Sequence, residues 1–180
     1  MAQPQIWTIR REAEGDAKRI AFLTEAGFGP GRYAKSAYRL REGVAAVTDL
    51  SLVAVEDGIL RGSVRFWPIK AGESDALLLG PLAVESAERG RGIGISLMQA
   101  GIAAARDAGW PVILLVGDEP YYSRVGFVKL QPGRLRFPGP VDQSRLLGLP
   151  LVEGALEGLS GMIRRAKIDD PRCADGAPLG

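Results

Sequence analysis

The spacing of hydrophobic and polar positions changes several times along the chain, and each spacing predicts a different element. Residues 6–10 alternate between apolar and polar side chains, which predicts a first strand. Residues 14–26 carry apolar side chains close to helical spacing and stop at Gly27, which predicts a helix. A breaker follows, and residues 32–41 are expected to form a second, short helix.

The next segment has the pattern of a hairpin. Residues 50–56 and 59–67 are strand-like, and the pair Asp57-Gly58 stands between them. An Asp-Gly pair between two such runs is a strong hairpin signal, because both residues tolerate the left-handed conformation that the tight turn needs. Residues 68–75 are then expected to form a turn.

A nearly unbroken apolar run at residues 76–84 is typical of a strand buried on both faces. Pro81 within it cannot donate a ladder hydrogen bond, so we expect a bulge or an unpaired edge there. Residues 92–108 are predicted to be a helix that ends at Gly109, with an inward face made of Ile93, Leu97, Gly101, Ala104, Ala105 and Ala108.

The remaining elements are shorter. Residues 111–116 predict another buried strand, and residues 119–122 a helix of one turn with Pro120 at its start. Further strands are expected at residues 127–130, 145–152 and 159–165. The order is that of a mixed α/β sheet in one domain over residues 1–168, with a flexible tail at 169–180.

Composition narrows the chemistry more than it narrows the fold. The chain has no histidine, which excludes Ser-His-Asp and Cys-His catalysis and imidazole metal ligands. The one cysteine, Cys173, allows neither an internal disulfide framework nor a cysteine zinc site, so no metal is expected. A net charge of +2 without a dense basic stripe does not suggest a nucleic-acid partner.

The lengths of the apolar runs indicate where in the cell the protein is expected. None of them approaches the length of a membrane span, so no membrane partner is expected. The N-terminus lacks the apolar core of a secretory signal, and a cytoplasmic location is the resulting expectation.

A glycine-rich turn, Arg89-Gly90-Arg91-Gly92-Ile93-Gly94, joins the buried strand to the helix. Backbone N–H groups at a helix N-terminus bind phosphate oxygens, and glycines let the backbone come close to them. Arg89 and Arg91 add cationic donors. The dinucleotide fingerprint needs a third glycine where Ile95 stands, and the chain contains no P-loop string, so a different phosphate ligand is indicated.

Two motifs together resemble a known family. Arg89-x-x-Gly92-x-Gly94 resembles the acetyl-CoA signature Gln/Arg-x-x-Gly-x-Gly/Ala of the GNAT N-acetyltransferases. Residues 121–127, YYSRVGF, look like the family's Phe/Tyr-Tyr-x-x-x-Gly-Phe element. The resemblance covers residues 5–165 and is greatest to the bacterial YhbS-like branch of predicted acetyltransferases.

The resemblance implies a fold and a cosubstrate. It implies a mixed, centrally splayed β-sheet of about seven strands flanked by helices, with acetyl-CoA between the strands at residues 77–84 and 111–116. Backbone groups of the strand at residues 77–84 would bind the pantetheine arm, and the glycine-rich turn that follows it would bind the pyrophosphate. The residues expected to bind the cosubstrate are Leu82, Ala83, Val84, Arg89, Gly90, Arg91, Gly92, Ile93, Gly94 and Ile95.

The resemblance also implies a mechanism, in which an amine attacks the thioester directly and Tyr122 protonates the departing thiolate. The alternative is that Tyr122 only packs under the cosubstrate and that Tyr121 is a core aromatic. Many family members carry a glutamate base at the position of Leu78, so we expect water or a distant carboxylate to act instead. Glu25 and Glu73 are conceivable relays.

The acceptor stays open at this point. Without a strong base the enzyme is expected to favour α-amines, with pKa near 8, over lysine-like amines with pKa about 10.4. Small amines, peptide N-termini and protein lysines all remain possible acceptors.

Homodimers are frequent in this superfamily, so the resemblance allows one. Alternatives are a catalytically idle acyl-CoA-binding module and a nucleotide-binding domain of another kind. Aromatic side chains that could line an acceptor pocket are Phe28, Tyr33, Tyr38, Phe66 and Trp67.

Overall fold

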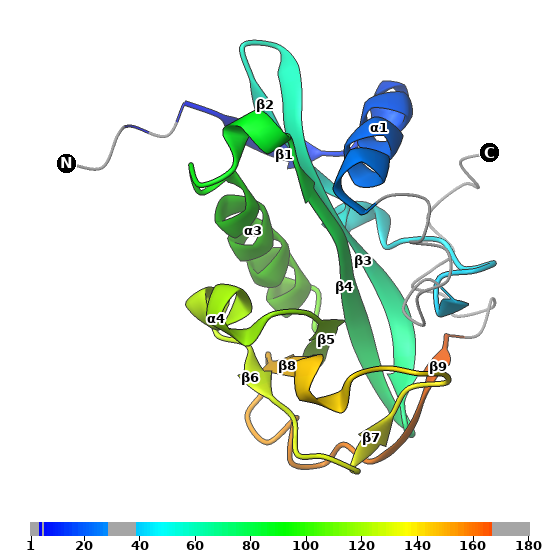
Figure 1. Ribbon diagram of the computed structural model, residues 1–180. Helices are drawn as coiled ribbons and strands as arrows, with labels where there is room; N and C mark the ends of the chain where they lie inside the picture. The colour runs from blue at the N-terminus through cyan, green and yellow to red at the C-terminus, as the bar shows by residue number, and fades with distance from the viewer. Residues whose placement is uncertain (1–3, 5, 29–38, 167–180) are drawn as a thin grey trace.

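The computed structural model describes residue 4, residues 6–28 and residues 39–166 (Figure 1). The strands are β1 (Thr8–Arg11), β2 (Leu52–Glu56), β3 (Ile59–Ala71), β4 (Ser74–Val84), β5 (Val112–Val116), β6 (Val128–Lys129), β7 (Leu135–Arg136), β8 (Leu146–Pro150) and β9 (Gly161–Arg165). The α-helices are α1 (Ala17–Phe28), α3 (Ile93–Asp107) and α4 (Glu119–Tyr122). Single 3-10 turns are η1 (Glu14–Asp16), η3 (Thr48–Leu50), η4 (Ser86–Glu88), η5 (Ser123–Val125) and η6 (Gln143–Arg145). The tail expected at 169–180 and most of the helix expected at 32–41 lie outside the described residues.

The sheet is mixed and opens in its middle. Its order is β1-β2-β3-β4-β5-β8-β6, and β9 joins β3 further along and pairs with β7. The pair β4–β5 is parallel and has only two register positions, Leu77 with Ile113 and Leu78 with Leu114. Beyond these residues the two strands separate, which confirms the predicted splay.

Within the described ranges the sheet has nine strands, where about seven were expected. The strands β6 and β7 are two residues long, and so short a segment carries no readable alternation of apolar and polar positions.

The predicted hairpin between β2 and β3 is confirmed. Asp57 and Gly58 both have positive φ, at 50° and 75°, as the tight turn requires. The turn expected at residues 68–75 is wrong, because β3 continues to Ala71 and β4 begins at Ser74. Pro68 is tolerated inside β3 since it lies between the stretches paired with β2 and with β9, where the described strands leave that edge open.

The bulge predicted at Pro81 is also confirmed. Leu79 pairs with Phe66 and Leu82 pairs with Val64, so Gly80 and Pro81 together face the single residue Arg65. The bulge lies just past the last pair between β4 and β5, and therefore at the start of the splay.

The helices α1 and α3 cover opposite faces of the long strands (Figure 1). Ile20 and Leu23 of α1 pack with Val53, Leu60 and Ala83. On the other face α3 buries Ile93, Gly94, Leu97, Met98, Gly101, Ile102 and Ala105. Ala108 was predicted to face inward and is exposed at the helix C-cap. Among the described residues no helix is long and apolar enough to cross a membrane.

Candidate functional site

A cavity of about 470 Å³ lies where β4 leaves β5 and runs into the turn before α3. Its size is in the usual range for ligand sites. In Figure 1, α3 and α4 lie on the same side of β4, and residues of all three elements line the cavity. The lining residues are Gly27, Leu82, Ala83, Val84, Glu88, Arg89, Gly90, Gly92, Ile93, Gly94, Ile95, Asp118, Tyr121, Tyr122 and Arg124.

The edge of β4 beside the cavity carries free backbone groups. The amide of Glu85 donates to the carbonyl of Arg61 at 2.8 Å, on the β3 side. Backbone groups alternate sides along an antiparallel pair, so those of Ala83 also face β3, and those of Leu82 and Val84 face the opposite edge. That edge has lost its β5 partner at this point, which leaves Leu82 and Val84 able to bond to an extended ligand.

The turn itself exposes amides at the start of α3. Gly92 is the N-cap and makes no side-chain capping bond, while its carbonyl accepts from the amide of Ser96 at 2.9 Å. The first amides of a helix have no partner inside it, and Ile93, Gly94 and Ile95 all line the cavity. The arrangement suits an anionic ligand, because the positive end of the helix dipole lies there as well.

The three glycines of the turn serve two different needs. Gly90 and Gly92 have φ of 85° and 94°, a conformation that side-chain-bearing residues rarely adopt. Gly94 lies within the helix with ordinary φ, but a Cβ there would clash with the hydroxyl of Tyr121. Conformation therefore requires glycine at 90 and 92, and space requires it at 94.

The two arginines of the turn lie differently. Arg89 is exposed, lines the cavity, and makes no side-chain hydrogen bond or ion pair with the residues that the structure describes. Arg91 does not line the cavity, and its guanidinium donates to Glu56 at 2.7 and 3.0 Å and contacts Glu88. The expectation that both arginines offer free donors to a phosphate therefore fits the side chain of Arg89 only.

Tyr121 and Tyr122 both line the cavity, with ring centroids 5.0 Å apart and the rings nearly perpendicular. The hydroxyl of Tyr121 lies against Gly94 at the start of α3. The ring of Tyr122 lies against Gly117, just after β5, and edge-on to Phe127 at 6.1 Å. Burial raises the pKa of Tyr122 to about 12, so its hydroxyl keeps its proton at neutral pH and can act only as a donor of it.

No carboxylate takes the place of the missing glutamate. Leu78 is 1% exposed and packs with Val112, Leu114 and other apolar side chains. Glu25 is exposed on α1, and Glu73 is exposed in the turn between β3 and β4, where it pairs with Arg164 at 3.2 Å. Neither lines the cavity, so the structure does not bring the two conceivable relays to the site.

The aromatic residues that could line an acceptor pocket lie in different environments. Phe66 is fully buried in the core against Gly101 and does not line the cavity, so it is a core residue and not part of an acceptor pocket. Trp67 is partly buried and donates from Nε1 to the carbonyl of Gly80 at 2.6 Å. Tyr33, Tyr38 and the side chain of Phe28 lie outside the described residues.

Sequence reasoning missed five lining residues, which are Gly27, Glu88, Asp118, Tyr121 and Arg124. The tandem of Tyr121 and Tyr122 was the one signal that could have pointed to such a residue, and Tyr121 was considered only as a core aromatic in the alternative interpretation. Asp118 is the N-cap residue of α4. Its side chain makes no capping bond, and its backbone carbonyl accepts from the amides of Tyr121 and Tyr122 instead. Across the described ranges, no cluster of three or more acidic or cysteine side chains could hold a metal ion.

Comparison with known proteins agrees with this geometry. The model of the acetyltransferase (GNAT) domain matches residues 48–129. The uncharacterized N-acetyltransferase YhbS of Escherichia coli K12 is 32% identical over 158 residues, which are 86% of this chain and 93% of that protein. The crystal structure of the E. coli YhbS in complex with CoA superposes with a TM-score of 0.73 at 30% identity, covering 92% of this chain and 93% of that one. A GNAT acetyltransferase from Brucella melitensis in complex with acetyl-CoA gives 0.68 at 30% identity, covering 91% and 98%.

Proposed function

The chain belongs to the GNAT family of acetyltransferases, and on that premise we propose that it transfers an acetyl group from acetyl-CoA to a primary amine by direct attack. The proposed acceptor is a small molecule or an α-amine. The open edge of β4 carries the proposal, because it leads from the splay at Leu78 toward the turn where we expect the pyrophosphate to bind.

The described residues fit acetyl-CoA in two parts. Leu82 and Val84 offer backbone donors and acceptors to the amides of the pantetheine arm, as a neighbouring strand would. The amides of Ile93 to Ile95, with Arg89, offer donors to the pyrophosphate. When bound, acetyl-CoA supplies the acetyl thioester on which the amine reacts.

Tyr122 is the proposed general acid. Of the two tyrosines, it lies against Gly117 beside the splay, while the Tyr121 hydroxyl lies at the start of α3 where the phosphates are expected. The hydroxyl of Tyr122 is protonated at neutral pH and can give that proton to a departing thiolate, but the raised pKa makes it a weak acid. Since a thiolate with a pKa near 8.5 already leaves readily, the contribution belongs at the low end of the usual range of about 10²- to 10⁴-fold.

The apolar surroundings of Leu78 support the choice of acceptor. With no carboxylate at position 78, the amine must arrive unprotonated or lose its proton to water or to a more distant carboxylate. At pH 7 that costs about 1.4 kcal/mol for an α-amine and about 4–5 kcal/mol for a lysine side chain. Acetylation of α-amines should therefore be faster than that of lysine side chains. Equal rates near neutral pH would contradict this preference.

The binding part is tested by calorimetry with CoA on wild type and on Gly92→Glu. A carboxylate at position 92 enters open space beside the cavity and should abolish binding. Gly133→Glu is the matched control, because Gly133 also has open space and positive φ but lies away from the cavity. The control should bind CoA like wild type, and binding that Gly92→Glu retains would overturn the proposed site.

The catalytic part is tested by acetyl transfer to a panel of amines with Tyr122→Phe. The variant should bind CoA normally and lose about a hundredfold in kcat. If wild type binds CoA but transfers acetyl to no amine, the chain is an acyl-CoA-binding module and the proposed activity is wrong.

A further inference from the structure

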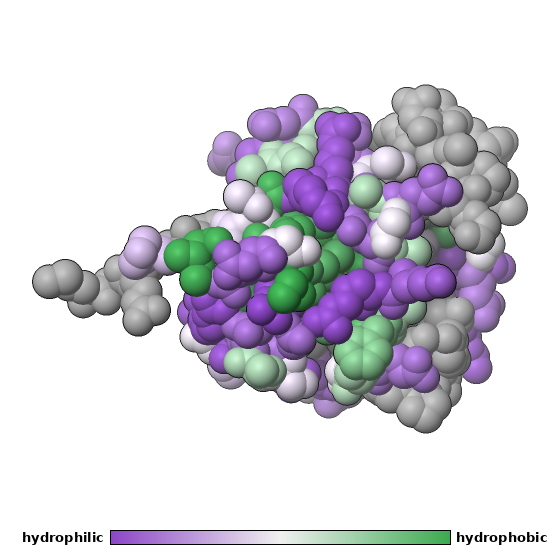
Figure 2. All heavy atoms as spheres, turned by 90° about the horizontal axis from the view of Figure 1, so that it is seen from above, coloured by the Kyte–Doolittle hydropathy of each residue, from purple (hydrophilic) through white to green (hydrophobic). Residues whose placement is uncertain are grey.

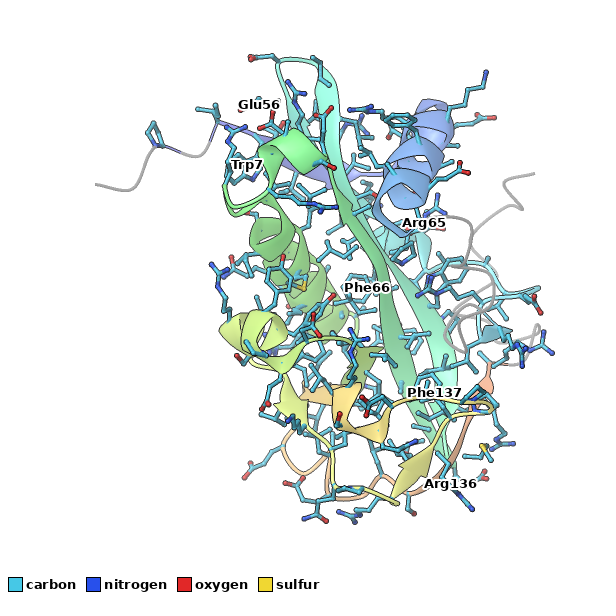
Figure 3. The ribbon with its side chains drawn as sticks, in the orientation of Figure 1. Trp7, Glu56, Arg65, Phe66, Arg136 and Phe137 are labelled. Atoms are coloured by element: carbon cyan, nitrogen blue, oxygen red, sulfur yellow. The ribbon has the colours of Figure 1, made fainter. Side chains whose placement is uncertain are left out.

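Six charged side chains form a closed cluster around the turn. Arg19 lies on α1, Glu56 at the end of β2, Arg61 on β3, and Glu85, Glu88 and Arg91 on the connection from β4 to α3. Hydrophilic side chains cover most of this end of the molecule (Figure 2), and Figure 3 shows Glu56 and Trp7 beside the turn.

The cluster is balanced in charge and held by close contacts. Glu85 binds Arg19 at 2.7 Å and Arg61 at 2.6 Å, and Glu56 binds Arg91 at 2.7 Å. Arg61 also lies 3.6 Å from Glu56 and 3.9 Å from Glu88. Three guanidinium groups therefore offset three carboxylates.

Glu88 and Arg91 differ in what they face. Glu88 lines the cavity together with Arg89 and Gly90, close to the first amides of α3, and its carboxylate contacts Arg91 and lies 3.9 Å from Arg61. Arg91 does not line the cavity, and its guanidinium donates hydrogen bonds to Glu88 and Glu56 outside the cavity. The hydrogen bonds that Arg91 donates to Glu56 and to Glu88 raise the pKa of its guanidinium, which therefore stays charged. Its guanidinium also lies 5.5 Å from the ring of Trp7, which packs against it.

A carboxylate beside a bound pyrophosphate repels it, because a charge at short range is only partly screened. The adjacent guanidinium removes most of that repulsion. Resting on the function proposed above, we propose that Glu88 limits the affinity for the phosphate-bearing cosubstrate and that Arg91 neutralises Glu88 without touching the ligand. Arg91 is thus a positioning residue whose effect on binding is electrostatic.

Four variants test the proposal through CoA affinity measured by calorimetry at low salt. Arg91→Gln leaves the turn one charge more negative and should weaken CoA binding about tenfold, which is about 1.4 kcal/mol. Glu88→Gln makes it one charge more positive and should strengthen binding several-fold. The double variant restores the balance and should return to within about threefold of wild type. Arg91→Lys keeps the charge but loses the paired hydrogen bonds to Glu56, and it should bind CoA nearly as wild type does.

Two further measurements separate charge from structure. In 0.5 M salt the differences in CoA affinity between the single variants should shrink, since salt screens the interaction between the charges of the turn and the phosphates of CoA. Pantetheine, which has the arm but no phosphate, should bind Arg91→Gln and wild type equally in an NMR titration. Melting curves establish that each variant is folded.

The proposal is overturned if Arg91→Gln and Arg91→Lys lose CoA binding equally, or if the double variant stays as weak as Arg91→Gln. Either result would make Arg91 a structural anchor only. Failure of wild type to bind CoA, or binding unaffected by Gly92→Glu, would instead overturn the proposed function, on which this inference rests.

Discussion

At the scale of single residues, the turn before α3 shows what a motif can and cannot predict. Its glycines were expected because the backbone must approach phosphate, and the structure gives the reasons position by position: positive φ at Gly90 and Gly92, and the Tyr121 hydroxyl at Gly94. The different roles of Arg89 and Arg91 could not be predicted. They depend on Glu56, which is distant in sequence and reaches Arg91 only through the fold.

Gly94→Ala should weaken CoA binding while the protein remains folded. The added methyl group meets the Tyr121 hydroxyl and must push that ring toward the cavity. We expect a loss of affinity of about tenfold and a destabilisation of about 1–3 kcal/mol, measured by calorimetry and by denaturant unfolding. Tyr121→Phe combined with Gly94→Ala removes the clashing oxygen and should recover most of both losses. No recovery would show that the close contact is not what requires glycine there.

The buried hydroxyl of Tyr122 makes the free energy of unfolding depend on pH in the alkaline range. Burial raises its folded pKa to about 12, above the unfolded value of about 10. The stabilisation is therefore complete below pH 10 and is lost as the pH rises through 12, with a loss of about 1.4 kcal/mol by pH 11. Between pH 8 and pH 11, wild type should lose about this much more unfolding free energy than Tyr122→Phe. Parallel curves for the two proteins would contradict the burial of this hydroxyl.

At the scale of elements, most helices and strands were predicted because their apolar spacing reflects the faces they bury. The hairpin at Asp57-Gly58, the bulge at Pro81 and the one-turn helix α4 came from local chemistry and are confirmed. The failures were tertiary. Pro68 is accommodated inside β3 because no described strand pairs with that edge of β3 at this position. The two-residue strands β6 and β7 form because β8 and β9 lie beside them.

The free edge of β4 can be tested with proline. Val84→Pro removes an amide N–H that faces away from β3, so it should cost little stability. It should weaken CoA binding several-fold, which is the effect of about one lost hydrogen bond. Ala83→Pro is the matched control on the other side, because it removes a donor to β3 and should lower the melting temperature markedly. Similar melting temperatures for the two variants would show that the assigned edge is wrong.

At the scale of the whole molecule, the charged cluster joins α1, β2, β3 and the turn before α3. Hydrogen bonds from Arg91 lower the pKa of Glu56, and those from Arg61 and Arg19 lower the pKa of Glu85. A lowered carboxylate pKa contributes stability that is present above the unfolded value near 4.5 and is lost as the pH falls.

The melting temperature of wild type should therefore fall as the pH drops from 5 to 3, and Glu56→Gln should show a smaller fall. Glu25→Gln, on the exposed surface of α1, serves as the control and should follow wild type. A pH dependence in Glu56→Gln as steep as in wild type would mean that this pair contributes nothing to acid stability.

The central claim is that the edge of β4 and the first turn of α3 together hold acetyl-CoA. Residue-resolved hydrogen exchange of the backbone amides, followed by NMR with and without saturating CoA, tests it most directly. If CoA binds there, exchange should be slower at Leu82, Val84, Ile93, Gly94 and Ile95 and unchanged at Gly133. Unchanged exchange at these five amides under saturation, or protection confined to another part of the sheet, would contradict it.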